Sequence, residues 1–208
     1  MRADGDSFRI FYLEVVVQRK TLWIGTTIIG ILVVATAVIY LTQKHSLLGA
    51  IINPPAPTAE INLTDSNGKP FALSDQRGKV VLLYFGYTNC PDECPLTMAH
   101  IKQAFDILGN KSKDVQVIMV STDPARDTQQ ALKDFMAKFN PTFLGLTGTP
   151  DELQKAWQDY GVTVENGGET HSTFLYVIDR AGNIRETFQP DTQPDSIATD
   201  VSFLLTGK

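Results

Sequence analysis

One stretch of the chain reads VVLLYFGYTNCPDECP, from Val80 to Pro95. Its first six residues, Val80 to Phe85, are continuously apolar, as expected of a strand buried on both faces of a sheet. Both cysteines of the chain, Cys90 and Cys94, follow, and Leu96 to Leu108 then carry apolar residues at helical spacing. The cysteines are therefore predicted to lie between a buried strand and a helix, where open α/β sheets bind ligands.

Strands and helices alternate on both sides of this stretch. Asn67-Gly68 predicts a tight hairpin turn, and Asp127 to Gln130 has the capping-box pattern that opens a helix. Thr149 to Glu152 is another helix start, with Pro at the first helical position and Glu at the third. The expected elements are a hairpin at 60–73, a strand at 80–85, a helix at 96–108, a strand at 115–120, helices opening at 127 and 149, a hairpin at 173–188 and a helix at 194–205. This order predicts an α/β fold, a thioredoxin-like layer sandwich with a parallel core sheet, an antiparallel edge and an extra N-terminal hairpin.

The N-terminal part has a different composition. Thr21 to Gln43 is a run of 23 residues without a charge, and its first 21 residues would span roughly 31 Å as a helix, which matches a bilayer core. Arg19 and Lys20 precede the run and Lys44 alone follows it, which favours a cytoplasmic N-terminus. We predict a single-pass protein of the bacterial inner membrane whose domain faces the periplasm.

The anchor sets the predicted domain boundaries. Pro54, Pro55 and Pro57 favour an extended, semi-rigid spacer after it, interpreted as a plain tether. The expected order is a cytoplasmic tail at 1–20, a transmembrane anchor at 21–43, a Pro-rich linker at 44–57 and the thioredoxin-like domain at 58–208.

A cleaved signal peptide is the alternative interpretation of the apolar run. Ala35-Thr36-Ala37 has the small-x-small form of a cleavage site. The run nevertheless continues to Leu41 and is preceded by 20 residues, so a retained anchor is favoured. Asp4, Asp6 and Glu14 argue against a mitochondrial transit peptide, which is poor in acidic residues.

Charge and cysteine count exclude several classes of protein. Residues 1–44 hold five of the 18 Lys/Arg and three of the 23 Asp/Glu, which leaves a net charge of −7 for the remainder. So acidic a domain does not fit a nucleic-acid groove, which needs a basic stripe. Two cysteines also exclude a disulfide-dense scaffold and an all-cysteine zinc site.

Three interpretations of the cysteine pair remain open on the residues alone. The thiols could be two buried apolar groups, a redox pair or ligands of a soft metal ion. The spacing exceeds the Cys-x-x-Cys redox motif by one residue, although a disulfide could still close. Pro95 suits a first helical turn, so Cys94 is expected at the helix start, where the dipole would stabilise its thiolate.

A stable Cu(II) or zinc site would also need an imidazole ligand, and the chain has three histidines. His45 is interpreted as a solvated residue beside the membrane segment. His100 lies six residues after Cys94, which turns it about 240° away from that cysteine on a helix. His171 precedes the penultimate strand, and in a thioredoxin-like fold that loop faces the helix carrying the cysteines. His171 is therefore the expected third ligand.

Three separated motifs resemble the Sco/SenC family of copper chaperones. They are residues 84–95 with the Cys-x-x-x-Cys-Pro signature, Ser121 to Thr128, and His171 with the strand that ends at Asp179. The resemblance covers roughly residues 58–205. It implies a thioredoxin fold in which Cys90, Cys94 and His171 bind copper, as Cu(I) or Cu(II). It also implies copper delivery to the binuclear copper A centre of cytochrome c oxidase.

The resemblance also implies partners for the protein and further roles for residues of the site. The partners are the copper-binding subunit of the oxidase and a copper donor protein or thiol reductant. In the metal-free state Cys90 and Cys94 are expected to form a reversible disulfide. Asp123 is either a group that supports the ligands or faces a partner, or a turn residue before Pro124.

An enzyme is the alternative to a copper chaperone from a different functional class. A thiol–disulfide oxidoreductase would use Cys90 and Cys94 to reduce the cysteines of the oxidase copper site, but dithiol exchange needs no distant imidazole. A peroxiredoxin is excluded by pattern, because Leu83 and Tyr87 occupy its Pro and Thr/Ser positions relative to Cys90. A metallochaperone is therefore favoured over an enzyme.

Overall fold

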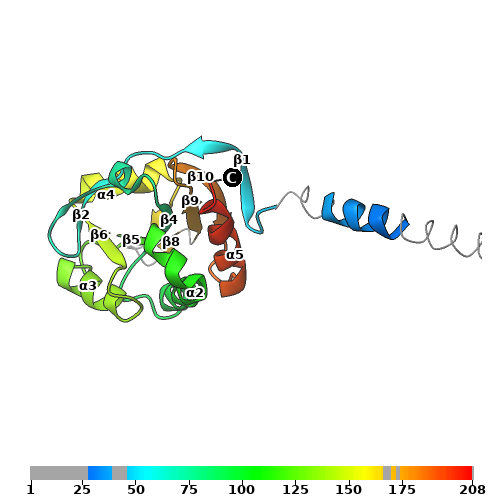
Figure 1. The fold of residues 1–208 in the computed structure, drawn as a ribbon. Coiled ribbons are helices and arrows are strands. Elements are labelled where there is room, and N and C mark those ends of the chain that lie inside the picture. Colours follow the sequence, from blue (N-terminus) through cyan, green and yellow to red (C-terminus); the bar gives the residue numbers. More distant parts are fainter. Residues whose placement is uncertain (1–27, 39–45, 166–169, 172–173, 208) are drawn as a thin grey trace, which may run out of the picture. The chain divides into compact units, whose positions relative to one another are not determined.

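A computed structural model of the chain describes residues 28–38, 46–165, 170–171 and 174–207. The chain divides into two units, residues 1–46 and 47–208. In the first unit, residues 28–38 form a helix with exposed Ile, Leu and Val side chains (Figure 1). Within the described residues, no helix is long and apolar enough to cross a membrane. Residues 21–27 and 39–43 of the predicted anchor, and His45, lie outside the described residues.

Strand β4 at Val80–Gly86 is the centre of the second unit, and every one of its residues is buried. It pairs in parallel with β5, and β5 pairs in parallel with β6. On its other side β4 pairs antiparallel with β9, which continues into β10. The eight-stranded sheet has the order β1-β10-β9-β4-β5-β6-β2-β3 (Figure 1).

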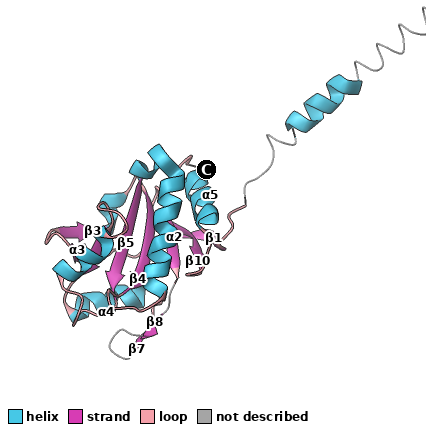
Figure 2. Ribbon diagram, turned by 90° about the horizontal axis from the view of Figure 1, so that it is seen from below, coloured by secondary structure: helices cyan, strands magenta, loops and turns pink. Residues whose placement is uncertain are grey.

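Most of the remaining elements follow the predicted alternation, and the strands at residues 50–57, 164–165 and 170–171 are additional to it. The strands are β1 (Ala50–Pro57), β2 (Asn62–Asp65), β3 (Pro70–Ala72), β5 (Val115–Ser121), β6 (Leu144–Thr147), β9 (Leu175–Ile178) and β10 (Asn183–Phe188). The helices are α2 (Glu93–Leu108), α3 (Gln129–Ala137), α4 (Pro150–Asp159) and α5 (Pro194–Leu204), with 3-10 turns at Leu73–Gln76 and Gly109–Asp114. A separate two-stranded sheet joins β7 (Val164–Glu165) to β8 (Thr170–His171) (Figure 2).

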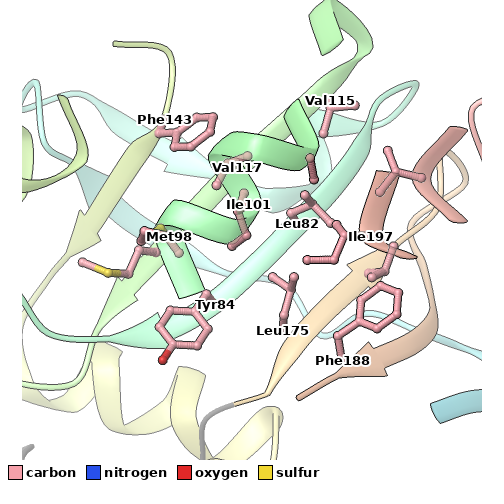
Figure 3. Packing of buried hydrophobic residues seen from close by; sticks show 14 of the residues in the cluster. Leu82, Tyr84, Met98, Ile101, Val115, Val117, Phe143, Leu175, Phe188 and Ile197 are labelled. Carbon is pink, nitrogen blue, oxygen red and sulfur yellow. The ribbon is translucent and has the colours of Figure 1, made fainter. Parts of the chain in front are cut away.

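Alternate residues of β4 pack into two cores, one on each face of the sheet. Leu82 and Tyr84 face α2, α3 and α5 in the first core, where Met98 and Ile101 of α2 lie beside them (Figure 3). The neighbouring residues of β4 face α4 and the β2–β3 hairpin in the second core. Both faces of β4 are covered, which confirms the prediction that this continuously apolar segment is a buried central strand.

Two predicted boundaries differ from the structure. Helix α3 begins one residue later than expected: Thr128 is its N-cap, and the Thr128 side chain accepts a hydrogen bond from the Ala131 N–H at 3.1 Å. Residues 50–57, expected as part of a free tether, form strand β1, which pairs with β10 at the edge of the sheet. Proline is tolerated there because an edge strand has N–H groups that need no partner in the sheet.

Two buried carboxyl groups hold the start of this unit. Glu186 of β10 and Asp200 of α5 are fully buried. The Gly49 N–H donates to Glu186 Oε2 at 2.9 Å, and the Leu48 N–H donates to Asp200 Oδ2 at 2.5 Å. A Cβ at Gly49 would lie only 2.6 Å from Glu186 Oε2, so the close approach requires glycine. Burial and the neighbouring Asp200 raise the pKa of Glu186 to about 8.

Candidate metal centre

The two cysteines lie where β4 leads into α2, as predicted. Cys94 is in the first turn of α2 and fully buried, whereas Cys90 is half-buried in the preceding loop, and both are free thiols. Cys90 Sγ accepts a hydrogen bond from the Cys94 N–H at 3.3 Å. The N-cap residue, Asp92, makes no side-chain capping bond, so a cysteine sulfur satisfies one of the otherwise unpaired N–H groups at the start of this helix.

Strand β4 encloses the buried sulfur from the other side. Tyr84 Oη lies 3.7 Å from Cys94 Sγ. A Cβ at Gly86 would lie 3.0 Å from the same sulfur and 2.7 Å from Tyr84 Cε1. Gly86 therefore leaves the space that Cys94 and Tyr84 occupy together.

Burial dominates the ionisation of Cys94. Burial, together with the smaller effect of the neighbouring Cys90, raises the pKa of the Cys94 thiol from 9.0 to about 12. Hydrogen bonds from the Tyr87 backbone and the Tyr84 hydroxyl act in the opposite direction. The expectation that the helix dipole would stabilise a thiolate here is wrong, because the desolvation of a buried sulfur outweighs the dipole. A metal ion bound at Cys94 must displace its proton.

Asp127 is a residue of this site that the sequence reasoning missed. Its carboxylate is buried, 1% exposed, and bonds to Thr88, two residues before Cys90, and to Ser121 at the end of β5. Its sequence context places Asp127 in the second family motif and at the start of a helix, and it predicts no role for this residue at the cysteine site. An Asp-Thr pair before a helix offers two capping residues, and here Thr128 caps the helix while Asp127 turns inward.

Asp123 lies in the same loop and is also buried. Its carboxylate forms an ion pair with Arg126, and the Arg126 guanidinium carbon lies 6.0 Å from the centre of the Tyr87 ring. Asp123 therefore reaches the cysteine loop through Arg126 and Tyr87. Its assignment as a group that supports the ligands stays a prediction.

The fold brings His171 to the correct end of the sheet. Tyr84 of β4 pairs antiparallel with Leu175 of β9, so the residues before Leu175 lie at the same end as the residues after Tyr84. His171 is in β8, where its backbone pairs with Val164. Its side chain is not among those described, so its role as a ligand stays a prediction. Within the described side chains, no three His, Cys, Asp or Glu residues form a metal-binding group.

His100 lies half-buried on α2. Its Nδ1 atom is buried and has no hydrogen-bond partner within the part of the chain that the structure describes. Its helical angle to Cys94 predicts no part in metal binding for His100.

The chain is similar in sequence and in structure to a group of known proteins. Residues 51–206 match the SCO1/SenC family. The mitochondrial protein SCO2 of Saccharomyces cerevisiae is 34% identical over 151 residues, which cover 68% of this chain and 50% of the yeast protein. The chain thus spans half the length of this relative.

Solved structures extend the likeness to the fold. Bradyrhizobium japonicum ScoI with copper bound has a TM-score of 0.67 and 32% identity, covering 72% of this chain and 100% of that one. BsSco has a TM-score of 0.64 and 26% identity, covering 76% and 99%. BsSco is described as a member of the Sco family of cytochrome c oxidase assembly proteins with a disulfide switch.

The likeness confirms the predicted thioredoxin-like α/β fold. It does not extend to the predicted transmembrane helix, which precedes the matched residues 51–206. The three motifs of the sequence analysis, including the loop that carries both cysteines, lie inside the match. The chain belongs to the SCO1/SenC family.

Proposed function

We propose that this protein binds copper through Cys90, Cys94 and His171 and assists assembly of the copper A centre of cytochrome c oxidase. The observation that carries the proposal is the pair of free thiols held together at the start of α2, with Cys90 Sγ 3.3 Å from the Cys94 N–H. Copper in the related ScoI structure and the oxidase-assembly role of the family to which BsSco is assigned support it.

The donor set suits copper in both oxidation states. Two thiolate sulfurs favour the soft ion Cu(I), and one imidazole helps to hold Cu(II). Three protein ligands leave a position open, so ligands of an acceptor protein can enter before those of the donor leave. Transfer then requires no covalent catalysis, and its direction depends on the relative affinities of donor and acceptor. The acceptor in this proposal is the copper-binding subunit of the oxidase, and a donor protein supplies the ion.

The proposal places the domain outside the inner membrane, tethered by the apolar segment at residues 21–43. The flanks of the apolar run support this orientation, because Arg19 and Lys20 precede it and Lys44 alone follows it. The tether keeps the chaperone at the membrane in which its acceptor is assembled.

A copper titration of the reduced protein tests the proposal. We expect one Cu(I) per chain in competition with a chromophoric chelator, and Cys90→Ala and Cys94→Ala should each abolish tight binding. The matched control is Ser112→Ala, since Ser112 lies in the 3-10 turn after the far end of α2 and its hydroxyl donates to the Gly109 carbonyl at 2.7 Å. A parent protein that binds no copper after full reduction would contradict the proposal.

A thiol–disulfide oxidoreductase is the second candidate function. The adjacent free thiols favour it, because Cys90 and Cys94 are four residues apart at one helix start. In this role the dithiol reduces the cysteines of the oxidase copper site: two thiols lose two electrons and two protons to the target disulfide. A disulfide formed between Cys90 and Cys94 blocks copper loading until a thiol reductant opens it. Thiol trapping during incubation with the oxidised acceptor distinguishes the two functions.

A further inference from the structure

Asp127 has an unusual environment for a carboxylate at the start of a helix. It is buried, and it accepts three short hydrogen bonds: Oδ1 from the Thr88 N–H at 3.0 Å and the Thr88 hydroxyl at 2.6 Å, and Oδ2 from the Ser121 hydroxyl at 2.6 Å. A buried carboxylate is costly unless such donors surround it. Hydrogen bonds to an ionised acceptor are stronger than neutral ones, so this set holds its partners firmly.

The donors come from two different parts of the fold. Ser121 is the last residue of β5, and Thr88 lies in the loop between β4 and α2. Asp127 itself is fixed from both sides. Its own N–H donates to the Asp123 carbonyl at 2.9 Å, and the next residue, Thr128, caps α3. One carboxylate therefore joins the cysteine loop to the end of β5 and the start of α3.

Thr88, which bonds to the Asp127 carboxylate, lies two residues before Cys90. The Cys90 N–H donates to the Tyr87 carbonyl at 3.4 Å, which closes a turn around Thr88. Beyond the turn, Cys90 Sγ meets the Cys94 N–H. The position of Cys90 is thus defined by the helix on one side and by the Thr88–Asp127 contact on the other. Without that contact, Thr88 would lose its hydrogen bonds to the carboxylate that also binds Ser121 at the end of β5.

We infer that Asp127 is a positioning residue of the cysteine site, which holds Cys90 where its sulfur and that of Cys94 act as one pair. The inference rests on the proposed function where it concerns copper. It rests on geometry alone where it concerns the two thiols. Groups that orient the ligands of a metal change its affinity by about 10- to 100-fold when they are removed.

Three variants of the full-length chain separate positioning from stability. Asp127→Ala removes the acceptors of Thr88 and Ser121. Asp127→Asn keeps the shape: its amide oxygen can accept both Thr88 bonds, and its amide nitrogen can donate to the Ser121 hydroxyl oxygen. Thr128→Ala is the matched control, because it removes the neighbouring α3 cap without touching the loop.

Two equilibria are measured on each variant. The first is Cu(I) affinity against a chromophoric chelator. The second needs no metal: the equilibrium with glutathione disulfide, in which Cys90 and Cys94 lose two electrons and two protons, form their disulfide and release two glutathione molecules. We expect Asp127→Ala to lower Cu(I) affinity by about 10- to 100-fold and to shift the second equilibrium toward the dithiol. Asp127→Asn should restore most of both, and Thr128→Ala should leave both unchanged.

The outcomes are distinguishable. If the parent binds no copper while Asp127→Ala still shifts the disulfide equilibrium, the proposed function fails and the positioning role stands. If the parent binds copper and Asp127→Ala matches it in both equilibria, the positioning role is wrong. The positioning role is also wrong if Thr128→Ala changes both equilibria as much as Asp127→Ala does, since general destabilisation then explains both variants. Should Asp127→Ala not fold, Thr88→Val replaces it; an unchanged Thr88→Val would overturn the inference in the same way.

Discussion

The hydroxyl of Tyr84 lies 3.7 Å from the sulfur of Cys94, between β4 and α2. Both side chains are fully buried, so neither group can exchange its partner for water. A hydroxyl in this position can donate to the sulfur and favours its thiolate form, although burial remains the larger effect on the Cys94 pKa.

Tyr84→Phe should therefore raise the pKa of Cys94 above its already elevated value. We expect the folded domain to lose about 1 kcal/mol of stability as well. Thiolate absorbance in the ultraviolet, followed against pH in a Cys90→Ser background, measures the shift. Tyr176→Phe is the control, since the Tyr176 hydroxyl donates to the Tyr160 carbonyl at 2.8 Å on the opposite face of the sheet. Equal titration curves for the Tyr84→Phe protein and its parent would contradict this prediction.

His171→Ala should weaken Cu(II) binding far more than Cu(I) binding. Two thiolates can still hold the softer ion, so we expect a loss on the order of 100-fold or more for Cu(II) and less than about tenfold for Cu(I). A Cu(II) titration monitored by thiolate charge-transfer absorbance, beside a Cu(I) competition assay, measures both. His100→Ala is the matched variant and should resemble the parent. If His100→Ala is the variant that loses Cu(II), the ligand assignment is wrong.

The Glu186–Asp200 pair predicts a pH dependence of stability. The pKa of Glu186 rises from 4.5 unfolded to about 8 folded, so between these values the native state holds a proton that the unfolded state has lost. The stabilisation is fully present below pH 4.5 and disappears as the pH rises through 8. Arg185 opposes the shift, and Asp200 reinforces it.

Glu186→Gln tests this dependence. A glutamine mimics the protonated acid, since it can accept from the Gly49 N–H and donate to Asp200. The parent should lose about 3.5 kcal/mol between pH 5 and pH 8 through this group, and the variant should lose little. Chemical denaturation across this range measures the difference. Parallel stability curves for parent and variant would mean that Glu186 does not hold the proton.

Protease accessibility tests the proposed membrane topology. Protease added to spheroplasts should digest the domain after residue 44, because the charge bias around the apolar run places it outside. A cytoplasmic protein followed in the same samples serves as the control for lysis. Protection of the domain, or its appearance as a soluble mature form, would overturn the anchored orientation.

The sequence predicted those parts of the fold that depend on local pattern. The continuous apolar run before Cys90 identified β4, and the capping box from Thr149 to Glu152 identified the start of α4, where both of its hydrogen bonds are present. Both elements could be predicted because periodicity and capping act over a few neighbouring residues. The grouping of the two cysteines with His171 rests on the family resemblance and stays a prediction.

What escaped prediction depends on contacts distant in sequence. Asp127 bonds to Thr88, which is 39 residues away, and no local pattern distinguishes a buried aspartate from a capping one. Burial raises the pKa of Cys94, and this burial depends on Gly86, which leaves space for the sulfur, and on Tyr84, which encloses it. Strand β1 has the extended backbone that its prolines predict, but its pairing with β10 comes from the other end of the domain.

The pairing of Tyr84 with Leu175 has one more consequence. It joins a segment near residue 90 to one near residue 171, so the proposed ligands come from chain regions that meet only when the central sheet is complete. An unfolded or half-folded chain then offers two thiols but no complete ligand set. Because a ligand that binds only the native state also stabilises it, cargo loading would report that the domain has finished folding. Under the proposed function, only a domain that has completed this pairing could then deliver copper to a partner.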